Sequence, residues 1–128
     1  MQPRETGEWP LLVGERARQL YVLKAEDIDY IESHGNYVRL HVGQLEYLRR
    51  DSVKQLTSLL AGTGFVRIER SLLVNVRAIR AARPLGRGSY TLLLGSGASV
   101  RSGAHYRDTM LQRLPVPPGV KVPEHESS

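Results

Sequence analysis

Between residues 20 and 50, apolar and polar positions alternate with the period of two that is typical of half-buried β-strands. The clearest example is residues 37–42, where Val38, Leu40 and Val42 occupy one face and polar or aromatic residues occupy the other. Gly43-Gln44 predicts a two-residue hairpin turn after this strand. The predicted strands of this part are residues 20–23, 27–33, 37–42 and 45–49, with a further turn at His34-Gly35.

The spacing becomes helical after Asp51, where apolar residues recur at intervals of three and four. Asp51 or Ser52 is the expected N-cap, and Gly62 or Gly64 marks the expected end. The residues expected on the buried face of this first helix are Val53, Leu56, Leu59 and Leu60.

Strand patterns return at Phe65–Glu69, and residues 70–79 predict one helical turn followed by a short strand. Further strands are expected at residues 80–83, 89–94 and 98–101, with turns at residues 84–88 and 95–97. A second helix is expected over residues 104–114, with Tyr106, Met110, Leu111 and Leu114 facing inward. Strands that are not separated by regular helices argue against a repeated βαβ pattern.

The chain therefore predicts one domain at residues 19–114, mainly β with two short helices. A partly ordered leader is expected at residues 1–18. The prolines of residues 115–119 break regular structure, so residues 115–128 are expected to form a flexible tail.

Charge is distributed unevenly along the chain, which carries a formal net charge of +5. Acidic residues exceed basic ones through Glu32, whereas arginine dominates from Val66 to Arg107. The arginines of that second part are Arg67, Arg70, Arg77, Arg80, Arg83, Arg87, Arg101 and Arg107. The guanidinium fork suits phosphate oxygens and guanine edges, which favours a polyanionic partner. A basic solvated face without a partner, or a coding bias toward arginine, would give the same composition.

Several other classes of protein do not fit the residues present. The chain has no cysteine, so a disulfide scaffold or thiolate metal site is excluded, and its four histidines lack the spacing of a zinc site. No apolar run approaches the length of a membrane span, and no signal peptide is evident at the start, so we expect a cytoplasmic protein without metal or cofactor. Phosphate-binding loops and nucleophile motifs are missing, which argues against an enzyme. Aromatic residues make up 6% of the chain, too few to favour RNA or single-strand binding.

Three stretches, in the right order and spacing, resemble one family. Residues 28–38 (IDYIESHGNYV) resemble a strand and turn of the form I-x-Y-I-E followed by x-G-N-Y-V. Residues 65–75 (FVRIERSLLVN) resemble the most specific signature, F-x-R-x-H-R-S-x-[IL]-V-N, and residues 103–107 (GAHYR) resemble the [SG]-R-x-Y segment that opens a last helix. These stretches are similar to the LytTR family of bacterial transcription regulators, and the match covers about residues 20–114.

The resemblance implies an elongated multi-sheet β fold whose loops, rather than a recognition helix, enter two successive major grooves of duplex DNA. It also implies pairs of domains on promoter repeats, with a homodimer that forms on DNA, and a receiver or membrane-bound sensor as regulator. We expect that regulator to be a separate chain. Contacts are expected from the first turn, from the Arg-Ser pair with its neighbours, and from the start of the last helix. The candidate DNA-contact residues are His34, Asn36, Arg67, Arg70, Ser71, Arg101, His105 and Arg107.

Two residues depart from the family pattern. Glu69 replaces the usual histidine. A carboxylate at this position could accept a hydrogen bond from a cytosine amino group or form an ion pair with Arg67, but it would repel phosphate. Ala104 replaces an arginine, so Arg101 or Arg107 would have to supply that contact. These departures favour an alternative function, a protein-interaction or signal-output module that keeps the fold without specific DNA binding.

Each candidate also has a purely structural interpretation. Arg70 could pair with Glu69 or Glu32, and Arg67 could contact phosphate or simply face solvent. The residues of the first turn, His34 and Asn36, could serve the turn alone. For Asn75 the structural interpretation is favoured, with its amide satisfying backbone groups inside the fold.

Overall fold

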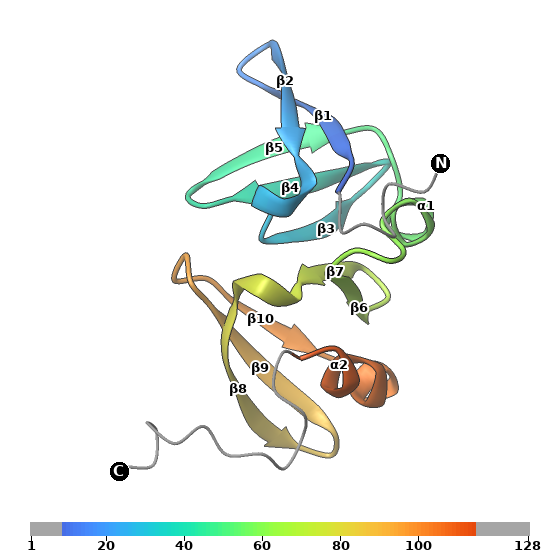
Figure 1. Cartoon of the computed structure of the whole chain (residues 1–128), viewed down its shortest axis with the longest axis vertical. Helices are drawn as coiled ribbons and strands as arrows, with labels where there is room; N and C mark the ends of the chain where they lie inside the picture. Colours follow the sequence, from blue (N-terminus) through green and yellow to red (C-terminus); the bar gives the residue numbers. More distant parts are fainter. Residues whose placement is uncertain (1–8, 115–128) are drawn as a thin grey trace.

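The computed structural model describes residues 9–114, which form an elongated body of ten strands in two antiparallel sheets with two short α-helices (Figure 1). This architecture confirms the expected mainly β fold with two helices. Within the described part of the chain, no helix is long and apolar enough to cross a membrane.

The larger sheet has seven strands in the order β2-β1-β5-β4-β3-β7-β6. Its strands are β1 (Leu11–Arg16), β2 (Gln19–Lys24), β3 (Tyr30–His34), β4 (Tyr37–Val42), β5 (Leu45–Arg49), β6 (Phe65–Glu69) and β7 (Leu72–Asn75). Helix α1 (Val53–Leu59) connects β5 to β6, and the Ser52 side chain accepts a hydrogen bond of 3.0 Å from the backbone N–H of Gln55. This is the N-cap expected from the sequence.

The smaller sheet contains β8 (Ile79–Gly86), β9 (Ser89–Leu94) and β10 (Ser99–Ser102), with β9 in the centre. A 3₁₀ turn at Ala104–Tyr106 leads from β10 into helix α2 (Arg107–Arg113). The second helix therefore begins with a 3₁₀ turn rather than as one α-helix over residues 104–114.

Two hydrophobic cores lie on opposite faces of the larger sheet. The first core packs α1 against one face through residues such as Leu40, Leu56 and Leu73. The second core joins β6 and β7 to the smaller sheet and α2 through residues such as Val74, Leu92 and Met110. Strand β6 contributes to both cores, since Phe65 belongs to the first and Val66 to the second.

Strand β1 is an ordered part of the segment that was expected to be a partly ordered leader. Leu12 and Gly14 are buried while Leu11 and Val13 are exposed. Apolar side chains on both faces hide the alternation that would have revealed this strand. Trp9 continues the packing and meets Phe65 edge-to-face at 5.8 Å.

Residues 70–79 also differ from the expectation, because the order of strand and turn is reversed. Strand β7 comes first, and a 3₁₀ turn at Val76–Ala78 follows. The buried Asn75 side chain fixes this order by accepting from the Arg77 N–H at 3.0 Å and donating to the carbonyls of Glu26 and Ile28 at 3.1 and 3.0 Å. The structural interpretation of Asn75 is thereby confirmed.

Smaller differences affect three other segments. Leu59 is exposed rather than on the buried face of α1. Strand β8 continues through Pro84 with irregular register, and the turn is confined to Arg87-Gly88. The expected tail at residues 115–128 lies outside the described residues.

Candidate nucleic-acid interface

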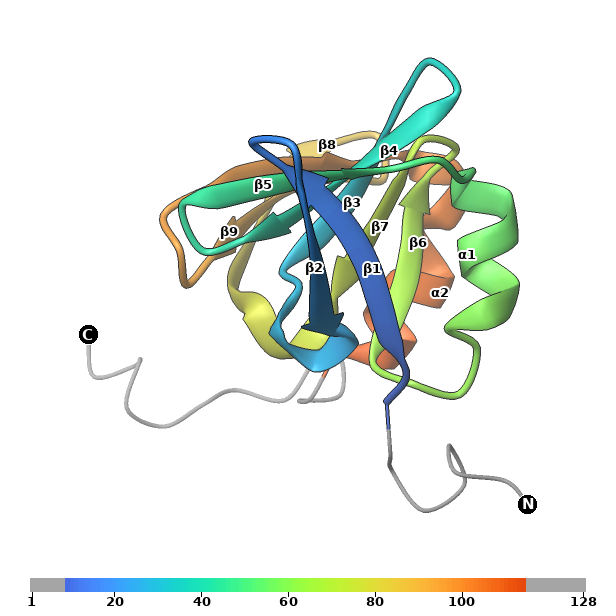
Figure 2. The same cartoon turned by 90° about the horizontal axis from the view of Figure 1, so that it is seen from above.

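Three exposed turns lie on the same side of the molecule and follow one another along its long axis (Figures 1 and 2). They are the β3–β4 turn at residues 34–36, the β6–β7 turn at residues 70–71, and the start of the last helix at residues 104–107. Backbone hydrogen bonds tie them together, from the Ser33 N–H to the Ser71 carbonyl at 3.0 Å and from the Gly103 N–H to the Ile68 carbonyl at 2.8 Å. Segments separated by 70 residues of sequence thereby form one fixed surface.

The β3–β4 turn presents His34 and Asn36 to solvent. Gly35 adopts a φ of +64°, a left-handed conformation that a glycine tolerates without strain. His34 has one side-chain contact, between its Nε2 and the Arg39 Nη2 at 3.4 Å. Within residues 9–114 the Asn36 side chain makes no hydrogen bond to protein, so the turn does not require its amide.

The β6–β7 turn exposes Arg70 and Ser71, and Arg67 of strand β6 contacts the backbone of this turn. The Arg67 Nη2 donates a hydrogen bond of 2.6 Å to the carbonyl of Arg70, and the guanidinium lies 5.9 Å from the centre of the Tyr106 ring. Arg67 is half-buried, and its Nε is buried without a protein partner in the described residues. Arg67 therefore contacts the turn rather than extending freely into solvent.

Arg70 has no carboxylate partner within the described part of the chain. Glu32, one expected partner, instead contacts His41 at 2.7 Å and Arg39 at 3.7 Å. Glu69, the other, packs its carboxylate against Gly103, where even a Cβ atom would lie within 3.0 Å of it. The guanidinium of Arg70 is consequently available to an external anion.

The start of the last helix exposes His105 and Arg107, and the β8–β9 turn packs directly against it. A Cβ atom built on Gly88 would lie 3.2 Å from the Ala104 Cβ and 3.3 Å from the Arg107 Cδ. This close approach places the β8–β9 turn, which contains the exposed Arg87 with a left-handed φ of 58°, beside Ala104. Local sequence pattern does not distinguish Arg87 from the other arginines, because the contact joins the β8–β9 turn to the 3₁₀ turn at Ala104–Tyr106.

The remaining candidate, Arg101, is exposed on β10. None of the side-chain contacts found in residues 9–114 joins it to the three turns. Arg107 has a neighbouring carboxylate, since its Nη1 donates to Asp108 over 2.9 Å in an exposed pair. Such an exposed pair is weak enough to rearrange when a phosphate approaches.

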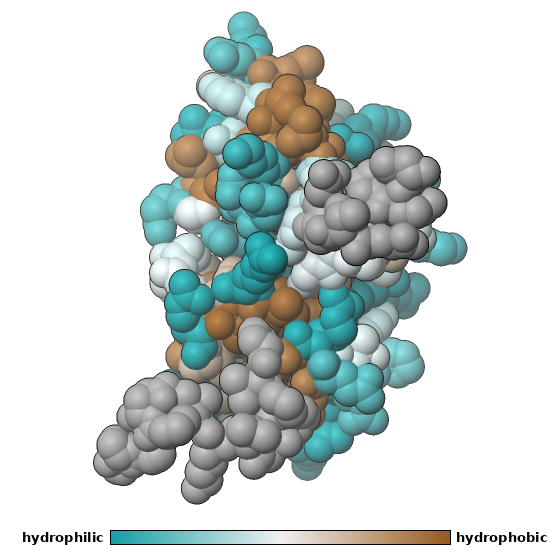
Figure 3. Space-filling view, viewed as in Figure 1, coloured by the Kyte–Doolittle hydropathy of each residue, from teal (hydrophilic) through white to brown (hydrophobic). Residues whose placement is uncertain are grey.

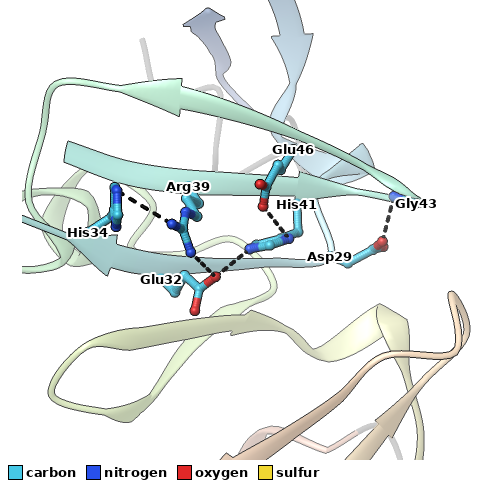
Figure 4. A network of polar contacts seen from close by, with 7 residues as sticks. All are labelled: Asp29, Glu32, His34, Arg39, His41, Gly43 and Glu46. Atoms are coloured by element: carbon cyan, nitrogen blue, oxygen red, sulfur yellow. Dashed lines mark hydrogen bonds and ion pairs between the residues drawn. The ribbon is translucent and has the colours of Figure 1, made fainter. Parts of the chain in front are cut away.

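Acidic residues along β3 and β5 are engaged in a local network that extends from the β3–β4 turn toward Gly43 (Figure 4). His41 lies between Glu32 and Glu46, and its ring stacks on Tyr30 with 4.0 Å between centroids. Burial, reinforced by the charge of Glu32, raises the pKa of Tyr30, so the phenol stays neutral. Within this network Glu32 is engaged with Arg39 and His41 rather than with Arg70.

Three comparisons with known proteins bear on this arrangement. A search of the curated proteins found no match. Among solved structures, the chain is similar to the LytTr DNA-binding domain of a protein from Bacillus cereus that is described as a methyl-accepting/DNA response regulator. That match has a TM-score of 0.76 and 20% sequence identity, and it covers 83% of this chain and 97% of the other. The sequence model of the LytTr DNA-binding domain matches residues 18–114, more than half of the chain. The protein therefore belongs to the LytTr family of DNA-binding domains.

Proposed function

We propose that this domain binds duplex DNA sequence-specifically and regulates transcription, with its turns entering two successive major grooves along one side of the duplex. The observation that carries the proposal is the alignment of three exposed turns on a single side, tied by backbone hydrogen bonds. Turns fixed in this way can present side chains to base edges at set spacing, which direct readout requires.

The roles of the candidate residues follow from their surroundings. Arg70, exposed and without an acidic partner, is the proposed base-reading residue, and its fork fits the O6 and N7 atoms of guanine. His34 and Asn36 are proposed to contact bases or phosphates from the first turn, and Ser71 to contact phosphate beside Arg70. His105 and Arg107 would contact the backbone.

Arg87 and Arg101 supply further positive charge near the last helix. Arg87 is proposed to replace the missing side chain of Ala104, because the β8–β9 turn is packed against that residue. Arg101 would contribute to the general field that attracts DNA rather than to a specific contact.

Copies of the domain are proposed to bind promoter repeats in pairs, one domain to each repeat. A separate receiver or membrane-bound partner is proposed to control this binding. The solved relative is described as the DNA-binding domain of a methyl-accepting/DNA response regulator, and this description supports a place in signalling.

The test is binding of the purified protein to a labelled duplex from its own upstream region, titrated over a range of salt with a random duplex as competitor. Binding that survives the competitor would support the proposal. The logarithm of the association constant should then fall linearly with the logarithm of the salt concentration, and each phosphate contact should add about 0.9 to the magnitude of that slope. The upstream region need not contain the target repeat. As a control, sequences that the protein binds are therefore selected from a pool of random duplexes. Failure to enrich any sequence would favour the protein-interaction module, the alternative to which Glu69 and Ala104 point.

A further inference from the structure

Alternate side chains of strands β3 and β4 share one face of the larger sheet. In an antiparallel pair, directly opposed residues point to the same side, and their diagonal neighbours come within reach of long side chains. Arg39 lies opposite Glu32 and diagonal to His34, while His41 lies diagonal to Glu32. The register therefore gathers these four side chains into one row, which we call the β3–β4 row.

Polar contacts join the β3–β4 row from the middle of the sheet to the β3–β4 turn (Figure 4). The Nε2 of His41 lies 2.7 Å from the Oε1 of Glu32, and the Nη1 of Arg39 lies 3.7 Å from the same oxygen. The Nη2 of Arg39 reaches the Nε2 of His34 over 3.4 Å. At the other end, the Oε1 of Glu46 lies 3.8 Å from the Nδ1 of His41. One guanidinium thus links an anchored carboxylate to the imidazole of the turn.

The β3–β4 row separates two apolar regions of the same face. On one side Val74, opposite Tyr30, belongs to the second core. On the other side Leu48, opposite Arg39, is next to an exposed apolar region that appears as a brown area over the β1–β2 hairpin (Figure 3). The exposed apolar side chains of that hairpin are Leu11, Val13, Leu20 and Val22. Packing alone would continue one apolar region into the other, so the polar row between them points to a different role.

Stability does not explain the row either. The side chains of Arg39 and Glu32 are 35% and 32% exposed, and ion pairs exposed to this extent contribute little to the free energy of folding. What the contacts do is restrict the orientation of Arg39 and, through it, of the imidazole in the turn.

The contact between Arg39 and His34 fixes which imidazole nitrogen carries the proton. A guanidinium donates hydrogen bonds and cannot accept them. The Nε2 of His34 must therefore accept, which leaves a neutral ring with its proton on Nδ1. His41 is in the opposite state, because its Nε2–H donates to the carboxylate of Glu32. Within residues 9–114 no other side-chain contact involves the exposed His34, so its Nδ1–H is available to an external acceptor.

We propose that Arg39 is a positioning residue of the DNA interface, which sets His34 as a hydrogen-bond donor at the β3–β4 turn. This inference rests on the proposed function, in which His34 contacts bases or phosphates. An Nδ1–H donor fits phosphate oxygens, the N7 atoms of purines and the O4 of thymine, whereas it cannot accept from the amino groups of cytosine or adenine. Arg39 thereby restricts which base edges the turn can contact, without touching DNA itself.

The first test determines the tautomer of His34 from its imidazole nitrogen chemical shifts, by NMR of the full chain in slightly alkaline solution without DNA. We expect the Nδ1–H form in the wild-type protein and a mixture of tautomers in Arg39→Ala, because an imidazole without this contact exchanges between both forms. Arg39→Lys should resemble Arg39→Ala, since a single ammonium lacks the fork that spans Glu32 and His34. His41 is the internal control and should keep its proton on Nε2 throughout.

A wild-type His34 with its proton on Nε2, or an unchanged His34 tautomer in Arg39→Ala, would overturn the inference. Because this measurement needs no DNA, its failure is distinct from a failure of the proposed function. The expected tautomer in a protein that selects no duplex would contradict the proposed function instead.

The second test is a double-mutant cycle on a duplex selected by the wild-type protein. If Arg39 acts through His34, Arg39→Ala should weaken binding several-fold in the wild-type background and hardly at all in the His34→Ala background. Arg39→Lys should lose nearly as much as Arg39→Ala, although it keeps the charge. Additive losses, or full affinity of Arg39→Lys, would mean that Arg39 attracts DNA by its charge alone and would overturn the positioning role.

A matched pair of variants separates orientation from net charge. Glu32→Gln and Glu46→Gln each remove one negative charge from the same network, so a general electrostatic effect would strengthen DNA binding equally in both. Only Glu32 contacts Arg39. We therefore expect Glu32→Gln to bind the selected duplex several-fold more weakly than Glu46→Gln and to show a mixed His34 tautomer. Equal affinities and equal tautomers of the two variants would contradict the proposed chain of contacts.

Discussion

The Nη2 atom of Arg67 donates a 2.6 Å hydrogen bond to the backbone carbonyl of Arg70. Arg67 comes from strand β6, while Arg70 is in the turn that the strand enters. The same guanidinium also lies against Tyr106 at the start of the last helix. One partly buried side chain thus connects two of the three turns, which gives Arg67 a structural role that its outward position in an alternating strand did not suggest.

Replacing Arg67 by alanine should therefore affect specific DNA binding more than non-specific binding. The turn would lose the contact that holds its backbone, and Arg70 would lose its fixed orientation. We expect a loss of about 1–2 kcal/mol on a specific duplex and a smaller loss on random DNA, measured by fluorescence anisotropy. Arg83→Ala, which removes an equal charge from an exposed position on β8, is the control. Equal losses on both duplexes would instead indicate a simple phosphate contact.

Replacing Arg70 by alanine should remove base discrimination while leaving the fold intact. Its side chain is exposed and makes no ion pair in the described residues, so the thermal midpoint should change little. If Arg70 contacts a guanine, the specific complex should lose about 1–3 kcal/mol, and selectivity should relax at one position of the site. Unchanged affinity and selectivity would remove this residue from the interface.

Arg87 offers a test of how the chain compensates for Ala104. Arg87→Ala should lower DNA affinity, because one phosphate contact is lost. The slope of log affinity against log salt concentration should become smaller in magnitude by about 0.9. Ala104→Arg, introduced into the same variant, should restore part of the affinity, since the β8–β9 turn that contains Arg87 packs against Ala104. Arg80→Ala on the exposed part of β8 controls for net charge. Equal effects of the Arg80 and Arg87 variants would indicate a general electrostatic contribution.

Asn75 should be among the most sensitive positions for stability. Its buried amide bonds to three backbone groups, so Asn75→Ala would leave buried donors and acceptors without partners. We expect the free energy of unfolding to fall by about 2–4 kcal/mol in urea titrations. Asn36→Ala, which changes an exposed asparagine, should alter it by less than about 0.5 kcal/mol. A small effect at Asn75 would mean that water replaces the amide.

Much of the larger sheet could be predicted from local pattern alone. The residues 37–42 alternate cleanly because one face of β4 is buried against α1 and the other is polar. The cap at Ser52 was also predictable, since a capping hydroxyl acts on a residue only three positions away. Strand β1 was not predictable in this way, because its apolar residues face both the core and the uncovered side of the sheet.

Local pattern was enough to predict the family, the mainly β class and the turn after the strand that ends near His34, because these depend on short-range periodicity and turn chemistry. Three relationships became visible only in the folded chain: Arg67 supports the Arg70 turn, the β8–β9 turn packs against Ala104, and five apolar side chains of β1, β2 and β5 are exposed. Each of these relationships joins strands or hairpins through packing and register. Pairing partners are chosen by the cooperative burial of two cores, which no single stretch of sequence specifies.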